Sequence, residues 1–145
     1  MIDPIETLLN LFRADVALLA ATDGRIATQH KFMLNDNAAG RAWPLGTAVC
    51  VQSTTDAAAT TAGILSGRAT ITAFGPTPRD AQTVWGAVDM LCRYDGRRTV
   101  LTSRGVALVY SVALDLSPSA AVDAELGICF LQGSARYQIF MEAVA

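Results

Sequence analysis

The sequence predicts an α+β fold in which two helices pack on one face of a mostly antiparallel β-sheet, in the approximate order αβββαβββ. Three observations support this prediction. Two segments carry apolar residues at helical spacing behind clear capping residues, several others alternate apolar and polar residues, and a short glycine-containing turn joins two of the alternating segments. The 145 residues fit one domain, which we expect to span residues 1–145.

The first helix is expected to begin after Asp3, which can cap it, with Pro4 at the first helical position and Glu6 three residues after the cap. Apolar residues then recur every three or four positions, which predicts one continuous helix ending at Asp23-Gly24. The apolar stripe of this helix comprises Ile5, Leu8, Leu9, Phe12, Val16 and Leu19.

Strands and a long loop are expected next. Residues 25–29 predict a short strand, and residues 30–43 have no periodicity and predict a loop. Residues 45–53 and 61–74 predict a pair of strands joined by a weakly structured tip over 54–60.

The second strand of this pair alternates clearly. Ala69, Ile71 and Ala73 lie on one face, and Thr70 and Thr72 lie on the other. We therefore expect one face of the sheet to be covered and the other to be solvated.

A second helix is expected after the break at Gly75-Pro76, because Thr77 can cap it and Pro78 suits its first position. Asp80 lies in the first turn, where the helix dipole favours a carboxylate. The helix is expected to end after Arg93, at Asp95-Gly96. Its apolar stripe comprises Ala81, Val84, Trp85, Val88, Leu91 and Cys92.

The last third of the chain predicts further strands. Residues 99–102 and 106–116 flank Ser103-Arg104-Gly105, which is short enough for a β-hairpin. Residues 117–124 are loop-like, and residues 126–131 form an apolar run of ambiguous type. A closing strand is indicated by Tyr137, Ile139 and Met141.

No catalytic constellation is evident, and we expect a protein that is not an enzyme and has no catalytic, cofactor-binding or metal-binding residues. The single histidine, His30, has no neighbouring cysteine or paired carboxylate and is interpreted as a surface residue. Asp115, Asp123 and Glu125 could converge in the fold, but a solvated loop explains them better. No phosphate loop or nucleophile elbow occurs.

The three cysteines lie far apart, and each has apolar neighbours. This pattern favours buried free thiols in a reducing compartment over a metal site, whose ligands usually come in close pairs. These residues are Cys50, Cys92 and Cys129.

Charge gives little support for nucleic-acid recognition, since the net charge is −2 and the basic residues are scattered among the acidic ones. One local cluster exists: Arg93, Arg97, Arg98 and Arg104 surround the exit of the second helix and the following turn. It is either a solvated end of the molecule or a contact with a partner.

With 52% apolar and 17% charged residues, the chain is more apolar than average soluble domains, and some apolar surface is expected to serve partners. The loop residues Phe32 and Trp43 are candidates for such a contact. No window is apolar enough for a transmembrane helix, and no secretory signal can be drawn, so we expect a cytoplasmic protein with no membrane partner.

The order of elements resembles the tail-terminator, or tail completion, family of long-tailed (siphovirus-type) phages. The resemblance rests on Ile5 to Ile26, on Gly67 to Arg93 (GRATITAFGPTPRDAQTVWGAVDMLCR) and on the strand that continues to Leu116. The chain departs from the family pattern between Ala120 and Ser134, which is longer and more apolar than the polar loop expected before the final strand.

The resemblance implies a structural virion protein that forms a six-membered ring on the tail tube. Such a ring stops tube polymerisation, joins the tail to the head connector or neck protein, and lets DNA pass through without sequence-specific binding. It assembles in the bacterial host cytoplasm and needs no cofactor. The candidate interface residues are Phe32, Trp43, Arg97, Arg98 and Arg104.

Two alternatives remain open. One is another structural phage protein, such as a neck or head-tail connector or a tail tube subunit. The other is a small ligand-binding or enzymatic α+β domain, because such folds host many functions. A pocket with convergent polar groups would favour this last alternative.

Overall fold

The computed structural model describes residues 3–28, 46–53, 59–61, 63–93, 97–115, 118–123 and 127–141. Three helices and eight strands are present within these ranges, so the fold is α+β. The elements are α1 (Pro4–Arg13), α2 (Val16–Thr22), β1 (Ile26–Ala27), β2 (Ala48–Ser53), β3 (Ala59–Thr61), β4 (Ile64–Gly75), α3 (Pro78–Cys92), β5 (Arg98–Thr102), β6 (Gly105–Leu114), β7 (Ser119–Asp123) and β8 (Ile128–Met141).

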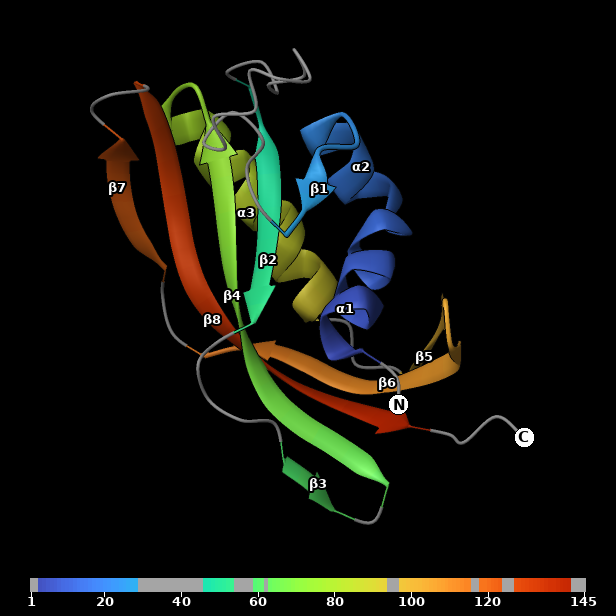
Figure 1. The fold of residues 1–145 in the computed structure, drawn as a ribbon. Coiled ribbons are helices and arrows are strands. Elements are labelled where there is room, and N and C mark those ends of the chain that lie inside the picture. Colours follow the sequence, from blue (N-terminus) through green and yellow to red (C-terminus); the bar gives the residue numbers. More distant parts are fainter. Residues whose placement is uncertain are drawn as a thin grey trace, which may run out of the picture.

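The strands form one mostly antiparallel sheet with the order β1-β2-β4-β8-β6-β5. The β1–β2 pair is parallel, β3 pairs with β4, and β7 pairs with β8. The two longest strands, β4 and β8, pair from Ile64 opposite Phe140 to Gly75 opposite Cys129. The sheet is strongly curled, and the helices lie on its concave side (Figure 1).

The main core fills the space between the helices and the concave face. Leu8 and Phe12 of α1 and Val84 and Val88 of α3 are fully buried, and they join Ile71 of β4 in one cluster. Apolar residues at helical spacing on one side and at alternate strand positions on the other produce this packing. Apart from Val16, the apolar stripes predicted from the sequence therefore face a common core.

The expectation that the other face of the sheet is solvated is wrong where β2, β4 and β8 meet. The alternate residues there form a second, smaller apolar cluster, and Thr72 is also buried. This cluster comprises Ala48, Cys50, Phe74 and Ile128, with Phe130 packed against it. Ala69, Ile71 and Ala73 are fully buried on the expected face. At this end the sheet therefore buries apolar residues on both faces.

The prediction of one continuous first helix is also wrong, because the chain forms α1 and α2. Asp15 has extended backbone angles, and its Oδ2 accepts a hydrogen bond from the backbone N–H of Leu18 at 2.9 Å. An aspartate in this geometry is an N-cap, so it starts a new helix. The apolar spacing continues across the break, except that Val16 is 80% exposed.

The closing region differs from the sequence-based expectation in two ways. Residues expected to be a loop over 117–124 include β7, and the single strand β8 contains the apolar run from Ile128 onwards together with the closing strand. In addition, the short strand β3 overlaps the end of the expected tip and the start of the expected return strand. Strand β1 is shorter than the strand expected over residues 25–29. The expected order αβββαβββ is thus replaced by ααββββαββββ.

Candidate interaction surfaces

A groove of about 790 Å³ lies between β5 and the three helices. Its walls are mostly apolar and include Leu11 of α1, Ala17 of α2 and Ala87 of α3. Two large apolar side chains line it and are nevertheless exposed, Met90 at 73% and Leu101 at 75%. Exposed apolar side chains gathered in a hollow are typical of a contact with another macromolecule.

Strand β5, which forms one wall of this groove, and the turn after it are held against α1 by hydrogen bonds. Asn10 Nδ2 donates to the carbonyl oxygen of Leu101 at 2.8 Å, and Glu6 accepts from the backbone N–H and the hydroxyl of Ser103 at 2.6 and 2.9 Å. The hydrogen bonds from Ser103 lower the pKa of the Glu6 carboxyl. A helix that satisfies groups of β5 and its turn protects this end of the sheet from pairing with another strand.

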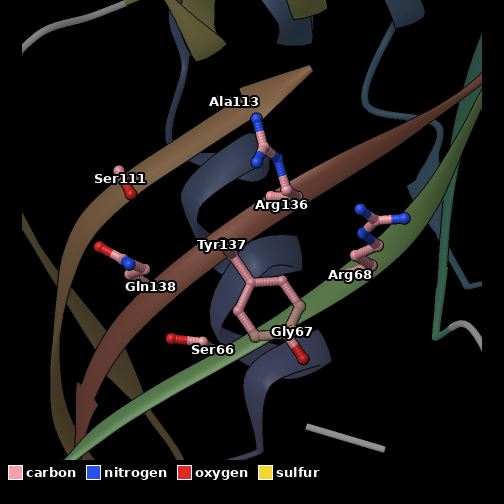
Figure 2. A pocket seen from close by; sticks show the side chains of 8 residues that line it. All are labelled: Ser66, Gly67, Arg68, Ser111, Ala113, Arg136, Tyr137 and Gln138. Carbon is pink, nitrogen blue, oxygen red and sulfur yellow. The ribbon is translucent and has the colours of Figure 1, made fainter. Parts of the chain in front are cut away.

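A second hollow, of about 470 Å³, lies on the convex face across β4, β8 and β6. Figure 2 shows its polar lining, with Arg68 and Arg136 extending from neighbouring strands and with Ser66, Ser111 and Gln138 around them. Asp115 forms salt bridges with both arginines, at 3.7 Å to Arg68 and 2.5 Å to Arg136.

Asp115 therefore does not belong to a solvated loop, and the interpretation made from the sequence is wrong for this residue. Its side chain is only 17% exposed, and one carboxylate is shared by two guanidinium groups. The three side chains together carry one excess positive charge. This arrangement suits contacts with polar or anionic groups, and arginine is favoured in such contacts because its planar fork donates several hydrogen bonds.

The arginines of the cluster identified in the sequence do not share one environment. Arg98 Nη1 donates to the carbonyl oxygen of Leu91 at 3.0 Å, so it ties the last turn of α3 to β5, and it also lines the groove. The Arg97 guanidinium lies 4.7 Å from the centre of the Tyr110 ring. Arg104 is exposed at the β5–β6 turn.

Arg93 forms a salt bridge with Asp89 at 2.8 Å on the surface of α3. This ion pair thus stabilises the C-terminal end of α3, and Arg93 does not line the groove. The other sequence-based candidates, Phe32, Trp43 and His30, lie outside the described residues.

The burial expected for the three cysteines is confirmed, since Cys50, Cys92 and Cys129 are buried free thiols. Burial raises the pKa of Cys50 and of Cys92 to about 12. In the described ranges, no three histidine, cysteine or acidic side chains are grouped so that they could hold a metal ion. The helices described there are all too short or too polar to cross a membrane.

No protein-family model matches the chain, and no curated protein matches it. Among solved structures, the chain is similar to a chain from the virion of a native gene transfer agent (GTA) particle. The likeness has a TM-score of 0.60 at 16% sequence identity and covers 90% of each chain. At this identity the likeness concerns the fold.

Proposed function

We propose that this protein is a structural subunit of a phage-like virion, and specifically a tail terminator. In this proposal copies of the chain form a ring that caps the tail tube, stops its polymerisation and joins the tail to the head connector. The single observation that supports it best is the fold likeness, over 90% of both chains, to a chain of a gene transfer agent virion.

The surfaces described above support assembly. A subunit of a closed ring needs two unlike patches, because each contact is head-to-tail. The apolar groove beside β5 and the polar hollow on the convex face differ in chemistry and belong to different faces of the sheet. The partners in the proposal are other copies of the chain, the major tail tube protein and the head-tail connector, while DNA passes through the ring without sequence-specific contacts.

The proposal also assigns roles to the candidate residues. Arg97 and Arg104 are exposed just beyond the two ends of β5 and can contact a neighbouring subunit or the tube. Phe32 and Trp43 are proposed for the same kind of contact from their sequence alone. Arg98 contributes by holding β5 against α3.

Deletion of the gene from the particle's genome tests the proposal. Without a terminator, DNA-filled heads should accumulate unjoined beside free tails that have polymerised past their normal length, and electron micrographs of the lysate show both. Supplying the gene in trans should restore joined particles with tails of normal length.

Two other outcomes would contradict this assignment. Unjoined tails of normal, closed length would indicate a neck or connector protein, and absence of tails would indicate a tube or tip protein. Joined particles of normal appearance would argue against any structural role in the tail.

A further inference from the structure

The polar hollow on the convex face places two arginines directly opposite each other. Arg68 of β4 and Arg136 of β8 are Cα partners in the antiparallel ladder, and their side chains are 51% and 63% exposed. Like charges in such a cross-strand pair repel each other, which destabilises a sheet. Asp115 offsets this repulsion with one carboxylate, so these three side chains together carry a charge of +1.

Arg136 is positioned to bind a second carboxylate. Asp115 contacts its Nε atom at 2.5 Å, and the backbone N–H of Asp115 is itself fixed by a hydrogen bond to the carbonyl oxygen of Ser134 at 2.9 Å. A guanidinium group has five N–H donors, so an ion pair through Nε leaves this exposed group able to donate to another acceptor. The hollow around it, of about 470 Å³, has room for a side chain of another molecule.

The turn between α2 and β1 carries a carboxylate that projects from the surface. The side chain of Asp23 is 90% exposed, although Arg25 Nη1 lies 3.6 Å from its Oδ2 atom. Asp23 has a φ of 53°, in the left-handed region, and the N–H of the next residue, Gly24, donates to the Leu19 carbonyl oxygen at 3.2 Å. A carboxylate on such a fixed turn loses little conformational freedom when it binds a partner.

This turn and the hollow lie on different faces of the sheet. Helix α2 covers the concave face and leads into β1 at one edge, whereas the hollow lies across β4, β8 and β6 on the convex face (Figure 1). The turn of one copy therefore does not fill the hollow of the same copy, and both are accessible to a second copy. The net charge of −2 of the whole chain disfavours a polyanion such as DNA in the hollow, whereas a single carboxylate matches its charge of +1.

We propose that the Asp23 carboxylate of one copy of this chain binds in the convex-face hollow of a second copy, where it pairs with Arg136 and Arg68. Two carboxylates then face two guanidinium groups, which offsets the repulsion within the β4–β8 arginine pair. This inference rests on the proposed function and deepens it, because it identifies a contact between subunits of the ring. Each copy has one such turn and one hollow, so the contact is head-to-tail and can repeat until a ring closes.

An exchange of charges tests the contact, with sedimentation of the purified full-length chain over a range of concentrations as the measurement. Asp23→Arg places a cation on the turn. Arg136→Asp replaces a positive charge of the hollow by a negative one, so the sum over its three charged side chains changes from +1 to −1. Each single substitution should weaken association about tenfold, because like charges then meet at the contact. The double variant Asp23→Arg/Arg136→Asp restores opposite charges and should regain most of the association.

The matched control is Asp23→Arg/Arg79→Asp, which has the same net charge as the double variant. Arg79 is exposed on α3 and does not line the hollow, so this control should associate as weakly as Asp23→Arg alone. Asparagine tolerates a positive φ better than arginine does, so Asp23→Asn removes the charge without straining the turn. It should also weaken association, and thermal melting verifies the fold of every variant.

The outcomes separate this contact from the proposed function. Unchanged association of Asp23→Asn, or equal recovery in the Arg79 control, would overturn the contact between the Asp23 turn and the hollow. A double variant as weak as the single ones would overturn it too, as would an unchanged chain that stays monomeric at every concentration. The terminator role is tested independently by the gene deletion, whose result does not depend on which residues join the subunits.

Discussion

Trp85 of α3 packs against a position in β8 that has no room for a side chain. A Cβ atom added at Gly133 would lie 2.7 Å from Cη2 and 3.1 Å from Cζ2 of the Trp85 ring. The indole is itself only 8% exposed. The close approach of α3 to the centre of the sheet therefore depends on pairing a large residue with the smallest one.

Gly133→Ala should lower the free energy of unfolding by about 1–3 kcal/mol, because the added methyl group overpacks the contact. Trp85→Phe removes the two ring atoms concerned, so the same glycine substitution in that background should cost clearly less. Denaturant unfolding of the four proteins measures this coupling. Equal costs in both backgrounds would mean that the methyl group is accommodated without contact with the ring.

The buried thiols make stability depend on pH in the alkaline range. The pKa of Cys50 and of Cys92 is raised by burial from 9.0 to about 12, so the folded chain keeps both protons at a pH where the unfolded chain loses them. The stabilisation is complete below pH 9.0 and is lost as the pH rises towards 12.

The expected fall in the free energy of unfolding is about 1.4 kcal/mol per pH unit for each thiol. Unfolding in urea with a reductant, measured at several pH values above 9.0, tests this slope. The control Cys50→Ala/Cys92→Ala should have a shallower slope. An identical slope in the control would show that other groups cause the pH dependence.

At the scale of the elements, the N-terminal helical region is divided by one side chain. Asp15 caps α2 through the Leu18 N–H, and α1 ends at Arg13 just before it. The apolar spacing alone indicates a single helix, because the same spacing continues in α2.

Removal of this cap should destabilise the protein measurably. Asp15→Ala is expected to lower the free energy of unfolding by about 1 kcal/mol, since the N–H of Leu18 loses its acceptor. Asp15→Asn keeps an acceptor oxygen at the same position and serves as the matched control. If thermal melting finds the alanine and asparagine variants equally stable, the cap does not set the helix boundary.

The sequence predicts α3 and the alternating part of β4 well because their signals are local. Thr77 caps α3 through the Asp80 N–H, as its position before Pro78 indicates. Such caps and apolar stripes depend on residues a few positions apart, so they can be identified without knowing the tertiary neighbours.

Strands β7 and β8 depend on distant partners, which is why the sequence predicts them poorly. The β7 sequence consists mostly of small residues with no strong strand preference, and it becomes a strand by pairing with β8. At the β7 end of β8, Cys129 and Leu131 face the main core, while Ile128 and Phe130 face the smaller cluster. Burial on both faces removes the apolar–polar alternation that identifies a strand.

The candidate surfaces were only partly predictable for the same reason. The arginine cluster is visible as a local concentration of charge, but the hydrogen bond from Arg98 to Leu91 requires the fold. Likewise, Leu101 and Val122 occupy strand positions that look like core positions in the sequence, and only the fold shows them to be exposed.

At the scale of the whole molecule, the curled sheet explains why two unlike patches exist. The concave face is filled by α1, α2 and α3, and the strands at the two sides of the sheet remain accessible (Figure 1). One side ends in the thin strand β7, and the other ends in the groove between β5 and the helices. The apolar groove and the polar hollow thus lie on different faces of one curved sheet, which suits repeated head-to-tail contact.

A sedimentation experiment tests whether the groove between β5 and the helices is a contact surface of the proposed ring. Met90 lines this groove and its side chain is 73% exposed, so Met90→Glu places a charge there without disturbing the core. At a concentration at which the unchanged protein assembles, this variant should sediment as a monomer, because the contact would bury an unpaired charge. The matched control Ala20→Glu adds the same charge at an exposed position of α2 outside the lining of the groove, and it should assemble like the unchanged protein. Full assembly of the Met90 variant would contradict a ring contact made through the groove.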